Sequence, residues 1–172
     1  LQYRGIDVEK MELAEKVIKN KTPLVKKKGH TSWGDPNNGF IGDMYSLNNP
    51  GYGVYHKPIS QLAEKYLPGK IIDLTGSEFN VLKNYLSLEK PVWVITNTTY
   101  KKLPDNAFQT WQTPSGEVNI TYKEHSVLIT GYNEKSVYFN DPISGQKNKS
   151  IPIKDFIEAW EQMGSQAISF RE

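Results

Sequence analysis

The chain has 172 residues, a length that fits one domain with a single hydrophobic core. Its formal net charge of +2 is close to balanced, and its basic residues do not alternate with aromatic ones, so no nucleic-acid partner is expected. No segment has the roughly 18 consecutive apolar residues of a membrane span, and the sequence contains no cysteine.

Helical patterns dominate the first half of the chain. Residues 1–5 are typical of a last helical turn closed by Gly5, a residue type that adopts the left-handed conformation at little cost. Because the sequence begins at Leu1 rather than at Met, we expect the start of that helix to lie outside these residues. Asp7 is expected to cap the next helix. Further helices are predicted from Pro58 to about residue 67, after a cap at Ser77, and over residues 153–163.

Strands are predicted mainly in the second half. Their short apolar or alternating runs cover residues 71–74, 92–96, 118–122, 125–132, 136–140 and 166–170. The unbroken apolar run after Pro91 favours a central position in a sheet. Residues 133–135 predict a tight hairpin between two of the strands. Helices first and antiparallel strands later favour an α+β fold, in one domain over residues 1–172.

The segment 29–55 is rich in Gly, Asn, Asp and Pro and predicts a long loop, which in a compact protein is often functional. The basic cluster at residues 26–28 just before it is expected to form a solvated turn. Within the loop, Trp33 and Asp35 are candidates for lining a substrate cleft, although Trp33 fits a loop-anchoring core position equally well. Trp111, in a polar segment between strands, is a third candidate, and loop packing explains it as well.

No cofactor or metal site is predicted. Residues 35–39 faintly resemble a calcium-binding loop, but a proline interrupts the pattern and the closing glutamate is missing. The three histidines of the chain do not have zinc-ligand spacing.

The strongest functional signal is the pair His125 and Asp141. His125 opens one apolar strand, and Asp141 ends the strand that a short hairpin brings back beside it. A carboxylate that orients a histidine base is a feature of nucleophilic catalysis. Asn140 is the alternative orienting residue, and because neighbouring strand residues point to opposite faces, only one of the two faces His125.

These segments resemble the bacteriocin-leader-peptidase-like cysteine peptidases, the peptidase C-thirty-nine-like group. The resemblance rests on His-Ser-Val-Leu-Ile-Thr-Gly-Tyr at 125–132 and Val-Tyr-Phe-Asn-Asp-Pro at 137–142, and on similar segments at 33–42, 51–55 and 159–165. It implies a papain-like fold in which a cysteine at the start of a long helix works with His125 as base and Asp141 as its orienter. The cysteine, and the glutamine that helps to form the oxyanion hole in this family, are absent here; by the family pattern the cysteine would lie about two helical turns before Leu1.

The resemblance therefore predicts the His and Asp half of a papain-like cysteine peptidase, inactive as it stands because it lacks the thiol. The expected partner is a peptide or protein substrate, and the expected location is extracellular or in the cell envelope of a bacterium. The alternative is a catalytically inactive module that keeps the cleft and binds a peptide or a cell-wall peptide. The order of motifs fits cell-wall endopeptidases of other papain-like families less well.

Overall fold

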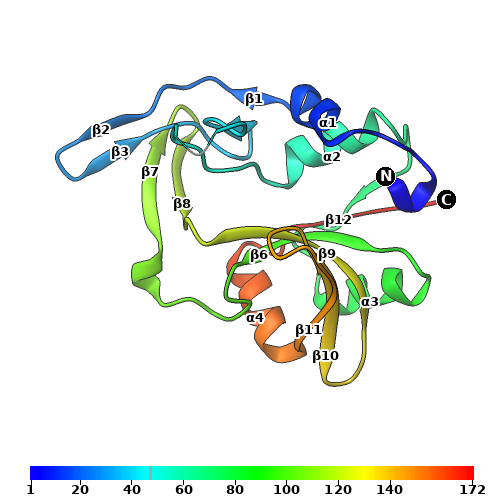
Figure 1. The fold of residues 1–172 in the computed structure, drawn as a ribbon. Coiled ribbons are helices and arrows are strands. Elements are labelled where there is room, and N and C mark those ends of the chain that lie inside the picture. Colours follow the sequence, from blue (N-terminus) through cyan, green and yellow to red (C-terminus); the bar gives the residue numbers. More distant parts are fainter. Residues whose placement is uncertain (47) are drawn as a thin grey trace. The chain divides into compact units, whose positions relative to one another are not determined.

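The computed structural model describes residues 1–46 and 48–172, in two compact units that each combine helices with β-structure (Figure 1). The first unit consists of Leu1–Lys70 with Phe108–Tyr122, and the second of Ile71–Ala107 with Lys123–Glu172. The mixed α+β class predicted from the sequence is confirmed. That the two units act as one domain stays a prediction. Among the described residues, no helix is long and apolar enough to cross a membrane.

The second unit is built on a six-stranded antiparallel sheet with the order β11-β10-β9-β6-β12-β5. Its elements are β5 (Ile71–Asp73), α3 (Phe79–Ser87), β6 (Val92–Asn97), the 3-10 helix η2 (Asp105–Ala107), β9 (Glu124–Tyr132), β10 (Ser136–Asp141), β11 (Gln146–Pro152), α4 (Ile153–Gln162) and β12 (Ala167–Phe170). β6 lies between β9 and β12, which confirms the central position predicted from its apolar run.

The main hydrophobic core covers one face of this sheet, where α3 and α4 pack (Figure 1). Alternate residues of a strand share a face, and Val127 and Ile129 of β9 enter this core from the same side as His125. Phe156 and Trp160 of α4 are fully buried in the same core. Because each such side chain contributes about 1.5–3 kcal/mol when buried, the core fixes which face of β9 is turned inward.

The first unit contains a four-stranded sheet with the order β2-β3-β7-β8, in which β3 and β7 run parallel and the other neighbours antiparallel. A second core of Trp33, Ile41, Trp111 and Ile120 fills this unit. Its elements are the 3-10 helix η1 (Gln2–Arg4), α1 (Lys10–Lys16), β1 (Lys19–Asn20), β2 (Val25–Lys27), β3 (His30–Ser32), β4 (Phe40–Ile41), α2 (His56–Glu64), β7 (Gln109–Thr113) and β8 (Gly116–Ile120).

The helices appear where the sequence predicts them, with different ends. Gly5 has φ 70° and closes the first turn as expected, although that turn is a 3-10 helix. The predicted caps are wrong: α1 and α3 start after Glu9 and Glu78, not at Asp7 and Ser77, and neither has a side-chain cap. The three helices α2, α3 and α4 otherwise coincide closely with the predicted segments.

Six strands were not predicted. β1 to β4 have only two or three residues each, and the longer β7 and β11 lack an apolar run. β7, with the sequence Gln-Thr-Trp-Gln-Thr, contains Trp111, which therefore lies on a strand and not in a loop. β11 is an edge strand made mostly of exposed polar residues. The basic cluster at 26–28 also differs from the prediction, because Lys26 and Lys27 belong to β2 and pair with β3. The long loop predicted over 29–55 contains β3 and β4 and is otherwise irregular within the described residues.

Candidate active site

His125 and Asp141 meet on the core-facing side of the second unit. His125 is the second residue of β9 and Asp141 the last residue of β10, and the two strands are neighbours in the sheet. The Nε2 atom of His125 lies 2.8 Å from Oδ1 of Asp141, and the side chains are 5% and 3% exposed. The structure thus joins the two residues that the sequence singled out.

The pairing between the strands selects Asp141 over its neighbour Asn140. Asn140 pairs with Leu128, which lies on the face of β9 opposite to His125. Its side-chain oxygen accepts a hydrogen bond from the backbone N–H of Asn148 at 3.0 Å, away from the histidine. Asp141 is therefore the residue of this pair that contacts His125.

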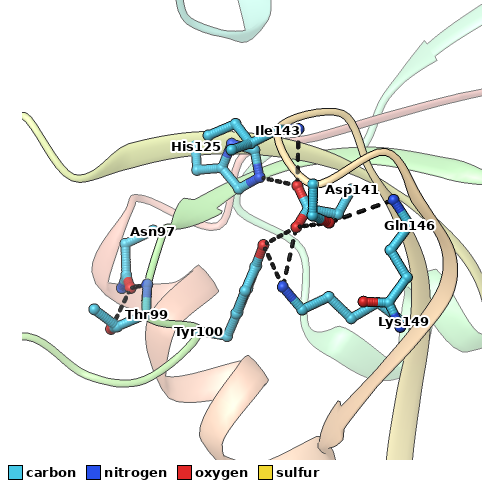
Figure 2. A network of polar contacts seen from close by, with 9 residues as sticks. Asn97, Thr99, Tyr100, His125, Asp141, Ile143, Gln146 and Lys149 are labelled. Atoms are coloured by element: carbon cyan, nitrogen blue, oxygen red, sulfur yellow. Dashed lines mark hydrogen bonds and ion pairs between the residues drawn. The ribbon is translucent and has the colours of Figure 1, made fainter.

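Five donors surround the carboxylate of Asp141 (Figure 2). Besides His125, the backbone N–H of Ile143 donates to Oδ1 at 3.0 Å. Oδ2 accepts from the Tyr100 hydroxyl at 2.8 Å, the Ser144 hydroxyl at 2.8 Å and the Lys149 ammonium at 3.0 Å. Each oxygen thus has its own set of donors.

This arrangement keeps Asp141 ionised. Burial alone would raise the pKa of its carboxyl group, since a charge is costly away from water. The hydrogen bonds from Ser144, Lys149, Tyr100 and His125 outweigh that effect and hold the pKa of Asp141 well below its usual range. At neutral pH the carboxylate is therefore an acceptor only.

The ionised carboxylate determines the tautomer of His125. A neutral imidazole has one N–H, and here that hydrogen belongs on Nε2, which faces an acceptor. The lone pair is then on Nδ1. Within the described residues, the hydrogen bond of the His125 ring is the one at Nε2, and none is made at Nδ1.

Tyr100 is held by the turn that follows β6. The Oδ1 atom of Asn97 accepts hydrogen bonds from the backbone N–H of Thr99 at 2.9 Å and from its hydroxyl at 2.6 Å. The Nδ2 atom of Asn97 donates to the carbonyl of Lys101 at 2.8 Å. Tyr100 itself has φ 55°, an uncommon conformation for a bulky residue. The buried Asn97 thus fixes a strained turn that aims the tyrosine at Asp141.

The Tyr100 hydroxyl remains a donor over the physiological range. Burial raises its pKa above the ordinary value, and the hydrogen bond and charge of Asp141 raise it further. The Tyr100 ring also lies edge-on to the His125 ring, with centroids 6.0 Å apart. Tyr100 therefore contacts both members of the pair.

Thr96 and Glu124 flank His125 without joining the network. Thr96 pairs with His125 across β6 and β9, and its buried hydroxyl has no hydrogen-bond partner in the described part of the chain. Glu124 precedes His125 on β9, so it points to the other face of the sheet. Burial raises the pKa of Glu124 to about 7.

The predicted cleft residues Trp33, Asp35 and Trp111 belong to the first unit. Trp33 and Trp111 are 3% and 0% exposed, and their ring centroids lie 5.1 Å apart, so both are core residues of that unit. Asp35 accepts hydrogen bonds from the backbone and side-chain N–H groups of Asn37 at 2.8 and 2.9 Å, which stabilises its own loop. A role of the three residues in a substrate cleft stays a prediction.

Sequence reasoning did not identify Tyr100, Ser144 and Lys149. Ser144 had a usable signal, because Asp-Pro-Ile-Ser-Gly at 141–145 has the composition of a turn, in which short polar side chains often accept or donate local hydrogen bonds. Lys149 had none, because β11 was not predicted. In the described residues, no group of three or more His, Asp or Glu side chains is placed to hold a metal ion.

The chain thus combines an α+β fold with a buried His–Asp pair, an arrangement in which a carboxylate can orient a histidine. The model of the Peptidase_C39 like family matches residues 1–168, and the chain belongs to this family. This confirms the resemblance noted in the sequence.

The chain is also similar to two individual proteins. The chain is 48% identical over 168 residues to the uncharacterized protein YvpB of Bacillus subtilis (strain 168); the match covers 98% of this chain but only 64% of that protein. The crystal structure of a protein described as a C39-like peptidase from Bacillus anthracis has a TM-score of 0.90 and 44% identity, over 99% of this chain and 83% of that one. The chain thus shares its fold with a solved member of this group.

Proposed function

We propose that these residues supply the base and the orienting carboxylate of a papain-like cysteine peptidase. The observation that carries the proposal is the 2.8 Å contact between Nε2 of His125 and a carboxylate held ionised by four further donors. That contact leaves Nδ1 as the basic nitrogen. Membership of the Peptidase_C39 like family supports a peptide or protein as the substrate.

The proposed chemistry uses both ring nitrogens of His125. Nδ1 takes the proton from a thiol, and the resulting thiolate attacks the carbonyl carbon of a peptide bond. Nδ1–H then gives the proton to the leaving amine nitrogen as the C–N bond breaks. Water hydrolyses the acyl-thioester, with Nδ1 accepting one of its protons, and this step restores the thiol. Throughout, Nε2–H stays bonded to Asp141, whose negative charge stabilises the imidazolium.

The thiol in this scheme comes from outside the 172 residues, since the chain contains no cysteine. The family pattern supports a cysteine about two helical turns before Leu1. The Bacillus subtilis relative is longer than the matched region, which is compatible with this arrangement. A thiol near an imidazolium and a helix start has a lowered pKa, which favours the thiolate at neutral pH.

The test is alkylation with iodoacetamide, under native conditions, of the full-length protein that contains these residues. We expect one carbamidomethyl group, located by peptide mapping just before Leu1, and hydrolysis of a peptide library that alkylation abolishes. His125→Ala should remove nearly all turnover, whereas Asp141→Asn should keep part of it, since the base remains. Unchanged turnover in the His125→Ala variant would refute the role of His125 as the base.

The absence of cysteine favours a second candidate, a peptide-binding module without catalysis. This candidate requires that the full-length protein take up no carbamidomethyl group, even after unfolding and reduction, and that it bind peptides or cell-wall peptides measurably. Hydrolysis by the full-length protein would exclude it. A location outside the cell or in the cell envelope is part of both proposals, on the basis of the resemblance alone.

A further inference from the structure

Lys149 is the cation of the Asp141 network, and it reaches the carboxylate from an edge strand. Its Nζ atom lies 3.0 Å from Oδ2 of Asp141, 3.4 Å from the Tyr100 hydroxyl and 4.5 Å from the centroid of the Tyr100 ring. The side chain is 25% exposed, whereas that of Asp141 is 3% exposed. The aspartate side of the ion pair is therefore shielded from water. For this reason the charge of Lys149 acts more strongly on the carboxylate than it would in water.

A bulge in β11 aims this lysine. Phe139 pairs with Lys149, but Asp141 pairs with Gln146, so β11 has one residue more than β10 over this stretch. Asn148 takes up the difference with φ 50°, and its backbone N–H donates to the side chain of Asn140. Bulges of this kind turn a side chain toward a neighbouring group. Here the side chain of Lys149 points at the carboxylate of Asp141 (Figure 2).

The donors divide the carboxylate into two functional halves. Oδ2 accepts hydrogen bonds from Lys149, Tyr100 and Ser144, and the hydrogen bond with His125 is made by the other oxygen. Oδ1 is left for Nε2 of His125 and the backbone N–H of Ile143. Without the ammonium, Oδ2 would keep only two neutral donors, and the carboxylate would be freer to rotate or to take a proton.

We propose that Lys149 is a positioning residue: by pinning Oδ2 of Asp141 it directs Oδ1 to Nε2–H of His125, so that Nδ1 is the basic nitrogen. This inference rests on the proposed function, in which Nδ1 accepts the thiol proton. Lys149 does not touch the reacting atoms. It acts through Asp141 on the tautomer of the imidazole.

The test compares Lys149→Met, Lys149→Arg and the control Lys147→Met by ¹⁵N and ¹³C NMR in the full-length protein that contains these residues. Lys147 lies on the same strand and is exposed, and its side chain forms no hydrogen bond or ion pair within the described residues, so the control removes an equal charge. In the wild type we expect neutral His125 to carry its hydrogen on Nε2. In Lys149→Met the Nδ1–H tautomer should become measurable and the carboxyl titration of Asp141 should move to higher pH. Lys149→Arg should restore both signals, and Lys147→Met should leave them unchanged.

The proposal is overturned by the wild-type protein alone if neutral His125 carries its hydrogen on Nδ1. It is also overturned if the spectra of His125 are identical in Lys149→Met and in the wild type. Lys149→Gln replaces Lys149→Met if the latter does not fold. In the full-length protein, Lys149→Met should lower kcat on the order of tenfold at little change in KM. The NMR signals need no thiol. A negative NMR result beside intact thiol-dependent turnover therefore rejects the role of Lys149 alone, whereas absence of turnover with the expected spectra rejects the peptidase.

Discussion

Asp141→Asn is the substitution that tests the polar network most directly. An amide has one acceptor oxygen and one NH₂ group where the carboxylate has two acceptors. If the oxygen stays toward His125 and Ile143, the NH₂ group faces Tyr100, Ser144 and Lys149. The two hydroxyls can rotate and accept from it, but the ammonium of Lys149 has no acceptor capacity. The interaction that Asp141→Asn mainly removes is therefore the ion pair with Lys149.

The size of this loss follows from the geometry. A hydrogen bond to a charged group contributes about 1.5–3 kcal/mol, and removing one partner of a fully buried ion pair costs about 3–5 kcal/mol. Lys149 is 25% exposed, so water compensates part of its loss. We expect Asp141→Asn to lower the free energy of unfolding by about 2–3 kcal/mol at pH 7, a large part of the roughly 5–15 kcal/mol of an ordinary domain.

Urea denaturation followed by circular dichroism measures this difference, and its pH dependence identifies the cause. The pKa of Asp141 is lowered in the folded state, so its contribution is complete above the unfolded value of about 3.9 and is lost as the pH falls toward the folded value. The difference between wild type and variant should be present at pH 7 and shrink below about pH 4. On a Lys149→Met background the same substitution should cost less.

A difference below about 0.5 kcal/mol at pH 7, within the range of ordinary surface substitutions, would refute the reasoning. So would a difference that does not decline in acid. Ser144→Ala is the matched control, because it removes one donor to the same oxygen and leaves every charge in place. It should cost about 1.5 kcal/mol, the lower end of the range for a hydrogen bond to a charged group, because a hydroxyl is a neutral donor.

Two further substitutions test the surroundings of the network and the first unit. Thr96→Val replaces a buried hydroxyl without a partner in the described residues by a methyl group, and should raise the free energy of unfolding by about 1 kcal/mol; a decrease in the same urea experiment would show that the hydroxyl has a partner. Gly42 has φ 81°, and a Cβ atom there would collide with the carbonyl oxygen of Pro50. Gly42→Ala should therefore lower stability by about 2 kcal/mol or more, whereas Gly29→Ala, also at positive φ but with open space around it, should cost about 1 kcal/mol. Equal effects of the two glycine substitutions would contradict the collision.

The sequence predicted the elements whose burial follows a simple period. β9 alternates strictly, with His125, Val127 and Ile129 buried, and α4 repeats its buried residues at helical spacing. β11 was not predicted, because both of its faces are largely exposed. It therefore has polar residues where a buried strand has apolar ones. Lys149 was missed with it. The hydrophobic period of a sequence indicates which residues are buried. An edge strand with two exposed faces has no such period, so the one charged residue that it supplies to a site is not found from the pattern.

The choice between Asn140 and Asp141 could not be made by counting residues. Near the hairpin, Tyr138 pairs with Gly131, and continuing this register would place Asn140 opposite Ile129, on the face of His125. A bulge between Tyr138 and Phe139 shifts the pairing by one residue, so that Phe139 pairs with Ile129 and Asp141 comes to that face. A one-residue shift exchanges the faces of a strand. Which residue contacts His125 thus depends on a bulge that no short sequence motif predicts.

The same geometry limits which nucleophile His125 could activate. Thr96 is the hydroxyl residue paired with His125 in the sheet, yet it is fully buried and forms no hydrogen bond with the imidazole. The Ser144 hydroxyl donates to Oδ2 of Asp141, whereas His125 contacts Oδ1. Neither group shares a proton with Nδ1, as a nucleophile activated by that nitrogen must. A thiol brought to Nδ1 from outside these residues therefore fits the pair better than either hydroxyl, and alkylation of the full-length protein is the experiment that separates cutting from binding.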